Sequence, residues 1–265
     1  MINELPQALT IGGSDSDGSA GIQADLLTFF NQKVHGSSVI TACVAGNSYG
    51  IHDRVLMPTS FIASQFKDLA DDYHIRASKT GMLADSKTIN DVAENYKKYD
   101  FGPLILDPVI ITKHGDLLLE QAAFDTLKEK LLPLATIITP NFYEAEKLTG
   151  FNKNDSNFME NAAHKLHDMG AKNIIIKGQH DNPNQKVVSD FVLLESGREF
   201  WLNAPYHNTD RVNGTGDTLS ACITAEIAKG SEMETAIRIA KSYVNQAIKN
   251  EIQVGHKFGP INHWA

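Results

Sequence analysis

The sequence lacks both a long hydrophobic run and an excess of positive charge. No apolar stretch approaches the roughly 20 residues that a helix needs to cross a bilayer, so we expect no membrane partner. The 24 lysines and arginines are outnumbered by 32 aspartates and glutamates, whereas proteins that bind nucleic acid phosphates carry basic surfaces. We therefore expect no nucleic acid partner either.

Cysteine is also scarce, because the chain has only Cys43 and Cys222. Both lie in apolar stretches far apart in the sequence, so we expect two reduced thiols in the core and neither a disulfide framework nor a cysteine metal site. The first residues have neither the basic flank nor the apolar stretch of a signal peptide. These absences predict a cytoplasmic protein.

What the chain does have is a regular alternation of short apolar runs with segments of helical period. Its 265 residues suffice for a full core, and the alternation predicts one α/β domain over residues 1–265, with a mostly parallel sheet between helices on both faces. We expect strands at residues 8–12, 38–45, 77–82, 104–110, 136–139 and 173–177, and a hairpin of 187–195 with 199–204. We expect helices at residues 20–33, 59–73, 86–99, 119–132, 156–169, 216–229 and 232–250.

A glycine-rich turn leads directly into one of these helices, with the sequence NGTGD at residues 213–217. The exposed first amides of such a helix form an anion site. Phosphoryl transfer needs donors for the phosphate oxygens and a base for the attacking hydroxyl, so Gly214, Thr215 and Gly216 are candidate donors and Asp217 is the candidate base. The same residues would also suit a plain helix start, where Asp217 only complements the helix dipole.

Polar residues stand at or just after the ends of three other predicted strands. Asn141 and Glu144 have the spacing of neighbours on one face of a helical turn, where they could hold Mg²⁺ through its waters or simply form a capping box. Asp107 is a candidate to add negative charge for a magnesium nucleotide, or a cap. Lys177 could reach the nucleotide phosphates or extend to water.

A second glycine-rich segment, residues 12–25, follows the first predicted strand. Its spacing does not match the dinucleotide-binding pattern G-x-G-x-x-G, and the Walker pattern is absent. A loop over a small ring substrate fits better. Gly13, Asp15, Gly21 and Asp25 are the candidate substrate-binding residues of this loop.

Short motifs along the chain resemble those of a known family, in the same order: GSDSDGSAGIQADL, KTGML, LDPV, TPNFYEAE, IIIKGQ, GTGDTLSA and FGPINHW. The resemblance, from about residue 8 to 264, is to the hydroxymethylpyrimidine and phosphomethylpyrimidine kinases of thiamin biosynthesis and the similar bacterial pyridoxal kinases. This group belongs to the ribokinase superfamily. The resemblance implies a ribokinase-like three-layer fold without a separate lid domain, usually as a homodimer, that binds ATP and Mg²⁺ at the carboxyl ends of the strands.

The resemblance also implies roles for individual residues. Asp217 would remove the hydroxyl proton, with Gly214 to Gly216 as the anion hole, and Asn141 and Glu144 would lie near magnesium. The residues implied near the nucleotide are Lys177, Asn141, Asp107, Thr209 and Lys241, and those implied near the ring are Gly13, Asp15, Gly21, Asp25, Gly46 and Met82.

Two positions depart from the pyrimidine kinases that the chain resembles. Most of those have cysteine at the position of Asp217, and at the position of Gly46 they typically have a glutamine that pairs with the aminopyrimidine. The expected reaction is transfer of the ATP γ-phosphate to the CH₂OH of hydroxymethylpyrimidine or its phosphate, or of pyridoxine or pyridoxal. The alternatives are a sugar or nucleoside kinase of the same superfamily and a non-catalytic nucleotide-binding module.

Overall fold

Strands and helices alternate along the residues that the computed structural model describes, which are 2–110, 121–180 and 182–265. The strands are β1 (Gln7–Asp15), β2 (His35–Asn47), β3 (Gly50–Leu56), β4 (Ala77–Thr80), β5 (Leu104–Leu106), β6 (Ala135–Ile138), β7 (Asn173–Ile176), β8 (Val187–Leu193) and β9 (Glu199–Pro205). The helices are α1 (Gly21–Asn31), α2 (Thr59–Asp72), α3 (Ser86–Lys98), α4 (Gln121–Lys130), α5 (Phe142–Thr149), α6 (Phe158–Asp168), α7 (Thr215–Ala228) and α8 (Met233–Lys249), with a short 3-10 helix, η1 (Leu132–Leu134).

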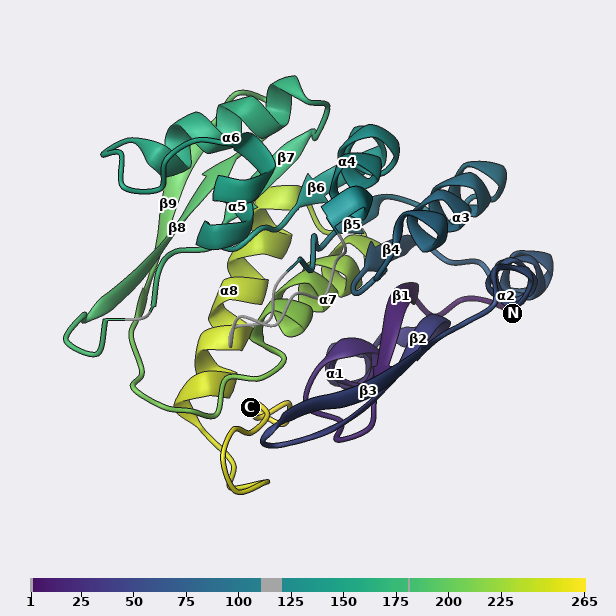
Figure 1. Ribbon diagram of the computed structural model, residues 1–265, viewed down its shortest axis with the longest axis horizontal. Coiled ribbons are helices and arrows are strands. Elements are labelled where there is room, and N and C mark those ends of the chain that lie inside the picture. The colour runs from purple at the N-terminus through teal and green to yellow at the C-terminus, as the bar shows by residue number, and fades with distance from the viewer. Residues whose placement is uncertain (1, 111–120, 181) are drawn as a thin grey trace.

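All of these strands join one nine-stranded sheet in the order β3-β2-β1-β4-β5-β6-β7-β8-β9. The strands from β2 to β7 in this order pair in parallel, whereas β3, β8 and β9 join by antiparallel pairing. The sheet runs diagonally across Figure 1, with α1, α7 and α8 on one side and α2, α3, α4 and α6 on the other. The expected α/β fold with helices on both faces is confirmed.

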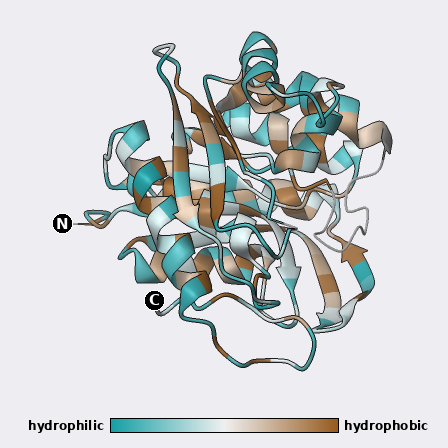
Figure 2. Cartoon of the chain, turned by 90° about the vertical axis from the view of Figure 1, so that its left-hand side faces the viewer, coloured by the Kyte–Doolittle hydropathy of each residue, from teal (hydrophilic) through white to brown (hydrophobic). Residues whose placement is uncertain are grey.

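Both faces of the inner strands are buried, which explains their nearly continuous apolar sequences. In β7, Ile174 and Ile176 pack in the cluster that includes α2, α3, α4, α5 and α6, and Ile175 packs in the cluster with α1, α7 and α8. Hydrophobic residues accordingly follow the strands and the inner faces of the helices in Figure 2. In the described part of the chain, no helix is both long and apolar enough to span a membrane.

The structure corrects the expected elements at several points. Strand β3 is not among the expected strands, because most of its residues are exposed at the edge of the sheet and show no buried apolar run. The expected strand over residues 104–110 stops at Leu106, before Pro108, which has no amide to donate. Cys43, expected in the core, is exposed on β2, whereas Cys222 is buried. The expected helix at 119–132 is described from Gln121 onward, and its residues 119 and 120 lie outside the described residues.

The strand order creates one special edge of the sheet. After β1 the chain passes through α1 to β2 on one side, and it returns later to β4 on the other side. Ligands of open α/β sheets bind at the carboxyl ends of the strands beside such a reversal. A ligand site is therefore expected among the segments at the carboxyl ends of β1, β4, β5, β6 and β7.

Candidate active site

A cavity of about 750 Å³ opens at this edge of the sheet. Five parallel strands each contribute a wall residue at or just beyond the carboxyl end: Gly13 from β1, Met82 after β4, Asp107 after β5, Asn141 after β6 and Lys177 after β7. The first turn of α7 closes the floor between these segments. Residues far apart in the sequence thus meet in one pocket because their strands run in parallel.

The turn before α7 requires glycine at Gly214. Its φ of +79° lies in the left-handed region, and a Cβ atom there would stand 2.3 Å from the carbonyl oxygen of Ser19. Gly216 lies in the first helical turn, whose amides have no partner within the helix. Thr215, by contrast, donates both its amide and its hydroxyl to the Val212 carbonyl, at 3.3 and 2.6 Å. Of the three expected phosphate donors, Thr215 therefore uses its amide and hydroxyl within the turn itself.

Asp217 faces the cavity from the first turn of α7, with its side chain 18% exposed. Burial raises the pKa of its carboxyl above the ordinary value, and the charge of Asp107 adds to this rise. The ammonium groups of Lys79 and Lys177 and a hydrogen bond from the Gly21 backbone lower the pKa again. A carboxylate with a raised pKa that remains accessible is suited to accept a proton near neutral pH.

Behind Asp217 lies a buried ion pair that the sequence did not predict. Lys79 Nζ is 2.6 Å from Asp25 Oδ1, and the other oxygen of Asp25 accepts a hydrogen bond of 2.5 Å from Thr10 Oγ1. Asp25 is only 1% exposed and does not line the cavity, so the structure does not bring this expected substrate residue to the ring. The available signal for Lys79 was a lysine between Ser78 and Thr80 in a short, otherwise uncharged strand.

Lys177 and Asp107 meet beside the α7 turn. Lys177 Nζ lies 3.8 Å from Asp107 Oδ1, and the second oxygen of Asp107 accepts from Ser220 Oγ at 3.0 Å. A Cβ atom on Gly216 would stand 3.3 Å from Lys177 Nζ. The ammonium group and the first turn of α7 therefore converge on the same part of the cavity, as binding of a phosphate requires.

Asn141 and Glu144 form a capping box at the start of α5. Asn141 Oδ1 accepts from the amides of Tyr143 and Glu144, and Glu144 Oε2 accepts from the Asn141 amide at 2.8 Å. Burial raises the pKa of Glu144 to about 7, with Lys177 lowering it and Asp107 raising it. The two residues thus have a structural role and also line the cavity.

The donor set bears on how magnesium could bind. Among the described residues no group of three or more His, Cys, Asp or Glu side chains could hold a metal ion. Mg²⁺ usually keeps several waters and is held by one or two carboxylates together with substrate phosphates. Glu144 and Asp107, both buried at the cavity wall, fit that mode of binding. These two carboxylates are too few to hold the ion without water and substrate phosphates.

The two remaining expected nucleotide residues differ in their placement. Thr209 does not line the cavity, and its hydroxyl donates to Glu251 Oε2 at 2.5 Å. Lys241 does line it, with Nζ 2.6 Å from Asp190 Oδ2. Asp190, which sequence reasoning missed, also accepts the Gly178 amide at 2.9 Å. Its signal was an acidic residue just before the apolar end of β8.

The expected substrate residues Gly13, Asp15, Gly21, Gly46 and Met82 also line the cavity. Both backbone polar groups of Gly46 are bonded to the hydroxyl of Ser16, which donates to the carbonyl at 3.0 Å and accepts from the amide at 2.9 Å. Val44, Val109 and Ile51 add apolar surface to the cavity. Burial, reinforced by Asp17, raises the pKa of Asp15 to about 6.

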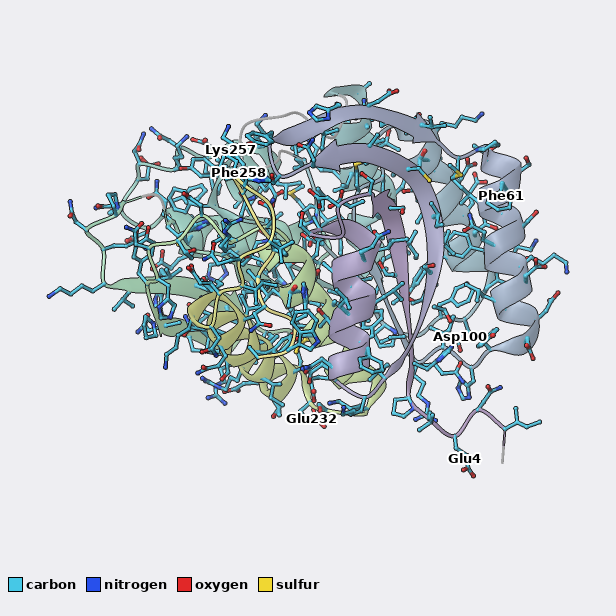
Figure 3. The ribbon with its side chains drawn as sticks, turned by 90° about the horizontal axis from the view of Figure 1, so that it is seen from below. Glu4, Phe61, Asp100, Glu232, Lys257 and Phe258 are labelled. Carbon is cyan, nitrogen blue, oxygen red and sulfur yellow. The ribbon has the colours of Figure 1, made fainter. Side chains whose placement is uncertain are left out.

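A segment near the carboxyl terminus, residues 257–263, holds the α7 turn from outside. Asn213 donates its amide to the Gly259 carbonyl at 3.0 Å and accepts from the Ile261 amide at 3.2 Å. His263 Nε2 lies 2.9 Å from the Thr218 hydroxyl. At its other end the segment reaches the β2–β3 hairpin, where Phe258 donates to the Ser48 carbonyl, and Figure 3 shows Lys257 and Phe258 beside these strands. This segment therefore links the α7 turn to the β2–β3 hairpin.

His263 should make stability depend on pH. Burial lowers the pKa of His263 to about 4, whereas a histidine in the unfolded chain titrates near about 6.5. Between these values the unfolded state binds a proton that the folded state does not, so the free energy of unfolding should fall as pH falls, by up to about 3 kcal/mol. Urea unfolding at about pH 7 and about pH 4.5 measures this change, and His263→Gln should remove that part of the slope.

His256→Gln, an exposed change in the same segment, is the matched control and should keep the wild-type slope. Equal slopes for wild type and His263→Gln would contradict a neutral, buried His263.

Comparison with known proteins identifies the family. The sequence pattern described as phosphomethylpyrimidine kinase matches residues 15–262. A hydroxymethylpyrimidine/phosphomethylpyrimidine kinase of Haemophilus influenzae is 45% identical over 265 residues, which cover 100% of this chain and 98% of the relative.

Two solved structures extend the likeness to the fold. Bacillus subtilis pyridoxal kinase in its ADP complex has a TM-score of 0.90 at 35% identity and covers 98% of both chains. Staphylococcus aureus pyridoxal kinase in complex with AMP-PCP and pyridoxal has a TM-score of 0.89 at 31% identity, covering 98% of this chain and 94% of that one. These neighbours confirm the expected ribokinase-like fold, and with the family match they show that the chain belongs to the phosphomethylpyrimidine kinase family.

Proposed function

We propose that the chain transfers the γ-phosphate of ATP to the CH₂OH group of a vitamin-precursor ring, with Asp217 as the base. The observation that carries this proposal is the convergence of Asp217, the glycine turn of α7 and Lys177 on one cavity. The names of the relatives supply the two ring types, a hydroxymethylpyrimidine and pyridoxal, and the solved complexes of the neighbours contain ADP or AMP-PCP.

In this proposal the proton of the substrate hydroxyl passes to a carboxylate oxygen of Asp217. The hydroxyl oxygen then forms a bond to the γ-phosphorus as the bond to ADP breaks. The amide of Gly216 and the ammonium of Lys177 stabilise negative charge on the transferred phosphoryl group. Lys241, whose ammonium group is held by Asp190, would contact the nucleotide.

Glu144 and Asp107 would hold Mg²⁺ through water together with the phosphates of ATP, as their position at the cavity wall supports. When bound, the ion supplies charge neutralisation for the phosphate oxygens. Asn141 then acts through Glu144, because its backbone amide fixes one carboxylate oxygen.

Gly46 bears on the choice of ring. Ser16 already satisfies its backbone polar groups, and no side-chain amide is present there to pair with an aminopyrimidine. A missing partner for a buried polar group costs about 1–3 kcal/mol, or roughly 5- to 150-fold in specificity. We therefore expect pyridoxal or pyridoxine to be turned over alongside hydroxymethylpyrimidine.

An ADP-release assay tests the proposal with pyridoxal, pyridoxine, hydroxymethylpyrimidine and its phosphate in parallel, and with ribose and adenosine as controls. At least one ring of each class should be phosphorylated, with kcat/KM values for the two classes within about 100-fold of each other. Turnover of sugars or nucleosides alone would refute the ring proposal. Binding of ATP without turnover of any alcohol would refute the kinase proposal.

We also propose that the protein works as a homodimer in the cytoplasm. Support for a dimer comes from the edge strand β3 and the turn before it, where Tyr49, Ile51 and Val55 are exposed apolar side chains. An open strand edge with apolar side chains favours association with another chain. Sedimentation velocity of the purified protein measures the oligomeric state.

A further inference from the structure

The buried ammonium of Lys79 is not used by the proposed phosphoryl transfer. Its side chain is 0% exposed in the middle of the sheet. A buried charge is retained only when it is paired and hydrogen-bonded, because its removal from water is costly. Burial alone would lower the pKa of Lys79, but attraction to Asp25, Asp217 and Asp107 outweighs this effect and holds it above the ordinary value.

Lys79 lies between two carboxylates. Its Nζ is 2.6 Å from Asp25 Oδ1 on one side and 3.7 Å from Asp217 Oδ1 on the other. Asp25 is fixed in turn, since Thr10 occupies its second oxygen. The ammonium group therefore faces the proposed base from beneath the cavity and is shared between the two acids.

The charged groups around Asp217 come from four further elements. Lys79 stands on β4, Asp25 on α1, Asp107 follows β5 and Lys177 follows β7. Lys177 lines the cavity and already contacts Asp107, so a bound phosphate would compete for its charge. Lys79 is out of reach of substrate, and its charge stays with Asp217 whatever the cavity holds.

We infer that Lys79 is a positioning residue that keeps the carboxylate of Asp217 ionised and in place. Asp25 weakens the attraction between Lys79 and Asp217, because it pairs with the same ammonium group. The inference rests on the proposed role of Asp217 as the base. Lys79 keeps its three protons throughout the reaction. Asp25, expected from the sequence to contact substrate, acts on the reaction only through Lys79.

The inference predicts opposite effects for the two partners. Lys79→Met removes the nearest cation, so the pH at which kcat/KM falls on the acid side should rise by about 1 to 3 units. Asp25→Asn leaves the ammonium to Asp217 alone, so the same limb should move to lower pH. Comparing each variant with wild type on one ring alcohol at saturating ATP cancels the ionisations of the substrates.

A double variant guards against a loss of folding, and a matched control tests whether the effect is specific. Removing one partner of a buried pair can unfold a protein, whereas removing both leaves no unpaired charge. The double variant Lys79→Met with Asp25→Asn should therefore fold, with its acid limb between those of the single variants. Glu226→Gln is the matched control, because Glu226 on α7 is also buried and paired with a lysine, Lys229, yet neither residue lines the cavity or is among the groups that shift the pKa of Asp217.

The outcomes are distinct. If the acid limb of kcat/KM shifts in the same direction in Asp25→Asn and Lys79→Met, or shifts in neither variant, the inference is overturned and the proposed function stays intact. An acid limb that moves as far in Glu226→Gln as in Asp25→Asn also overturns it. If Asp217→Asn keeps full activity, the base proposal and this inference fall together.

Discussion

Replacing Asp217 by asparagine should lower kcat/KM by about 100- to 10,000-fold, because a positioned general base contributes that much and an amide cannot accept the hydroxyl proton. The change keeps the size of the side chain and removes only the charge. Since Asp217 has its pKa raised by burial, loss of its charge should not destabilise the fold. Initial rates of ADP release on the best ring alcohol measure the effect.

Binding of the nucleotide is the internal control for this variant. Calorimetric titration with AMP-PCP should give a Kd for Asp217→Asn no weaker than that of wild type, because removal of a carboxylate near the phosphates reduces repulsion. Asp125→Asn, which alters an exposed side chain on α4, should leave kcat/KM unchanged. More than a tenth of wild-type kcat/KM in Asp217→Asn would show that Asp217 is not the base.

Gly214→Ala should lower kcat by about 100-fold. The new Cβ would stand 2.3 Å from the Ser19 carbonyl oxygen, so the α7 turn or the loop before α1 must move. A displacement of about 1 Å at reacting groups can cost on the order of 100-fold in rate. The left-handed backbone adds about 1 kcal/mol of strain, which thermal unfolding should detect.

Gly197→Ala separates strain from displacement. Gly197 in the β8–β9 turn has the same φ of +79°, but no atom lies within 4 Å of its added Cβ. This variant should lose comparable stability and keep its kcat. Equal losses of kcat in both variants would mean that the position of the α7 turn does not limit the reaction.

The inner strands could be predicted from the sequence because burial on both faces demands apolar residues in succession, as in Ile174, Ile175 and Ile176. Strand β3 could not, since it pairs only with β2 and leaves most of its side chains exposed. Exposed edge strands carry no such pattern. Exposure of Cys43 follows from the alternation of β2, which buries Ala42 and Val44 instead.

The expected site residues that line the cavity have in common that they follow strands or stand at glycine-rich turns, as Lys177 and Asp217 do. Parallel strands bring such positions to one edge, so their proximity could be anticipated from local patterns. The pairing of Lys79 with Asp25, 54 residues apart, depends on how β4 and α1 pack. No local pattern encodes that contact, so the sequence indicates Asp25 only as a residue of the substrate loop and gives no role to Lys79.

Protein synthesis sets an order in which this site can form. Synthesis runs from the amino terminus, so the sheet strands up to β9 and helix α7 leave the ribosome before residues 257–263. Asn213, however, obtains its two backbone hydrogen bonds from Gly259 and Ile261, and Thr218 meets His263 across 45 residues. The α7 turn of a nascent chain therefore lacks these contacts until residue 263 has left the ribosome, and we expect phosphoryl transfer to begin only then.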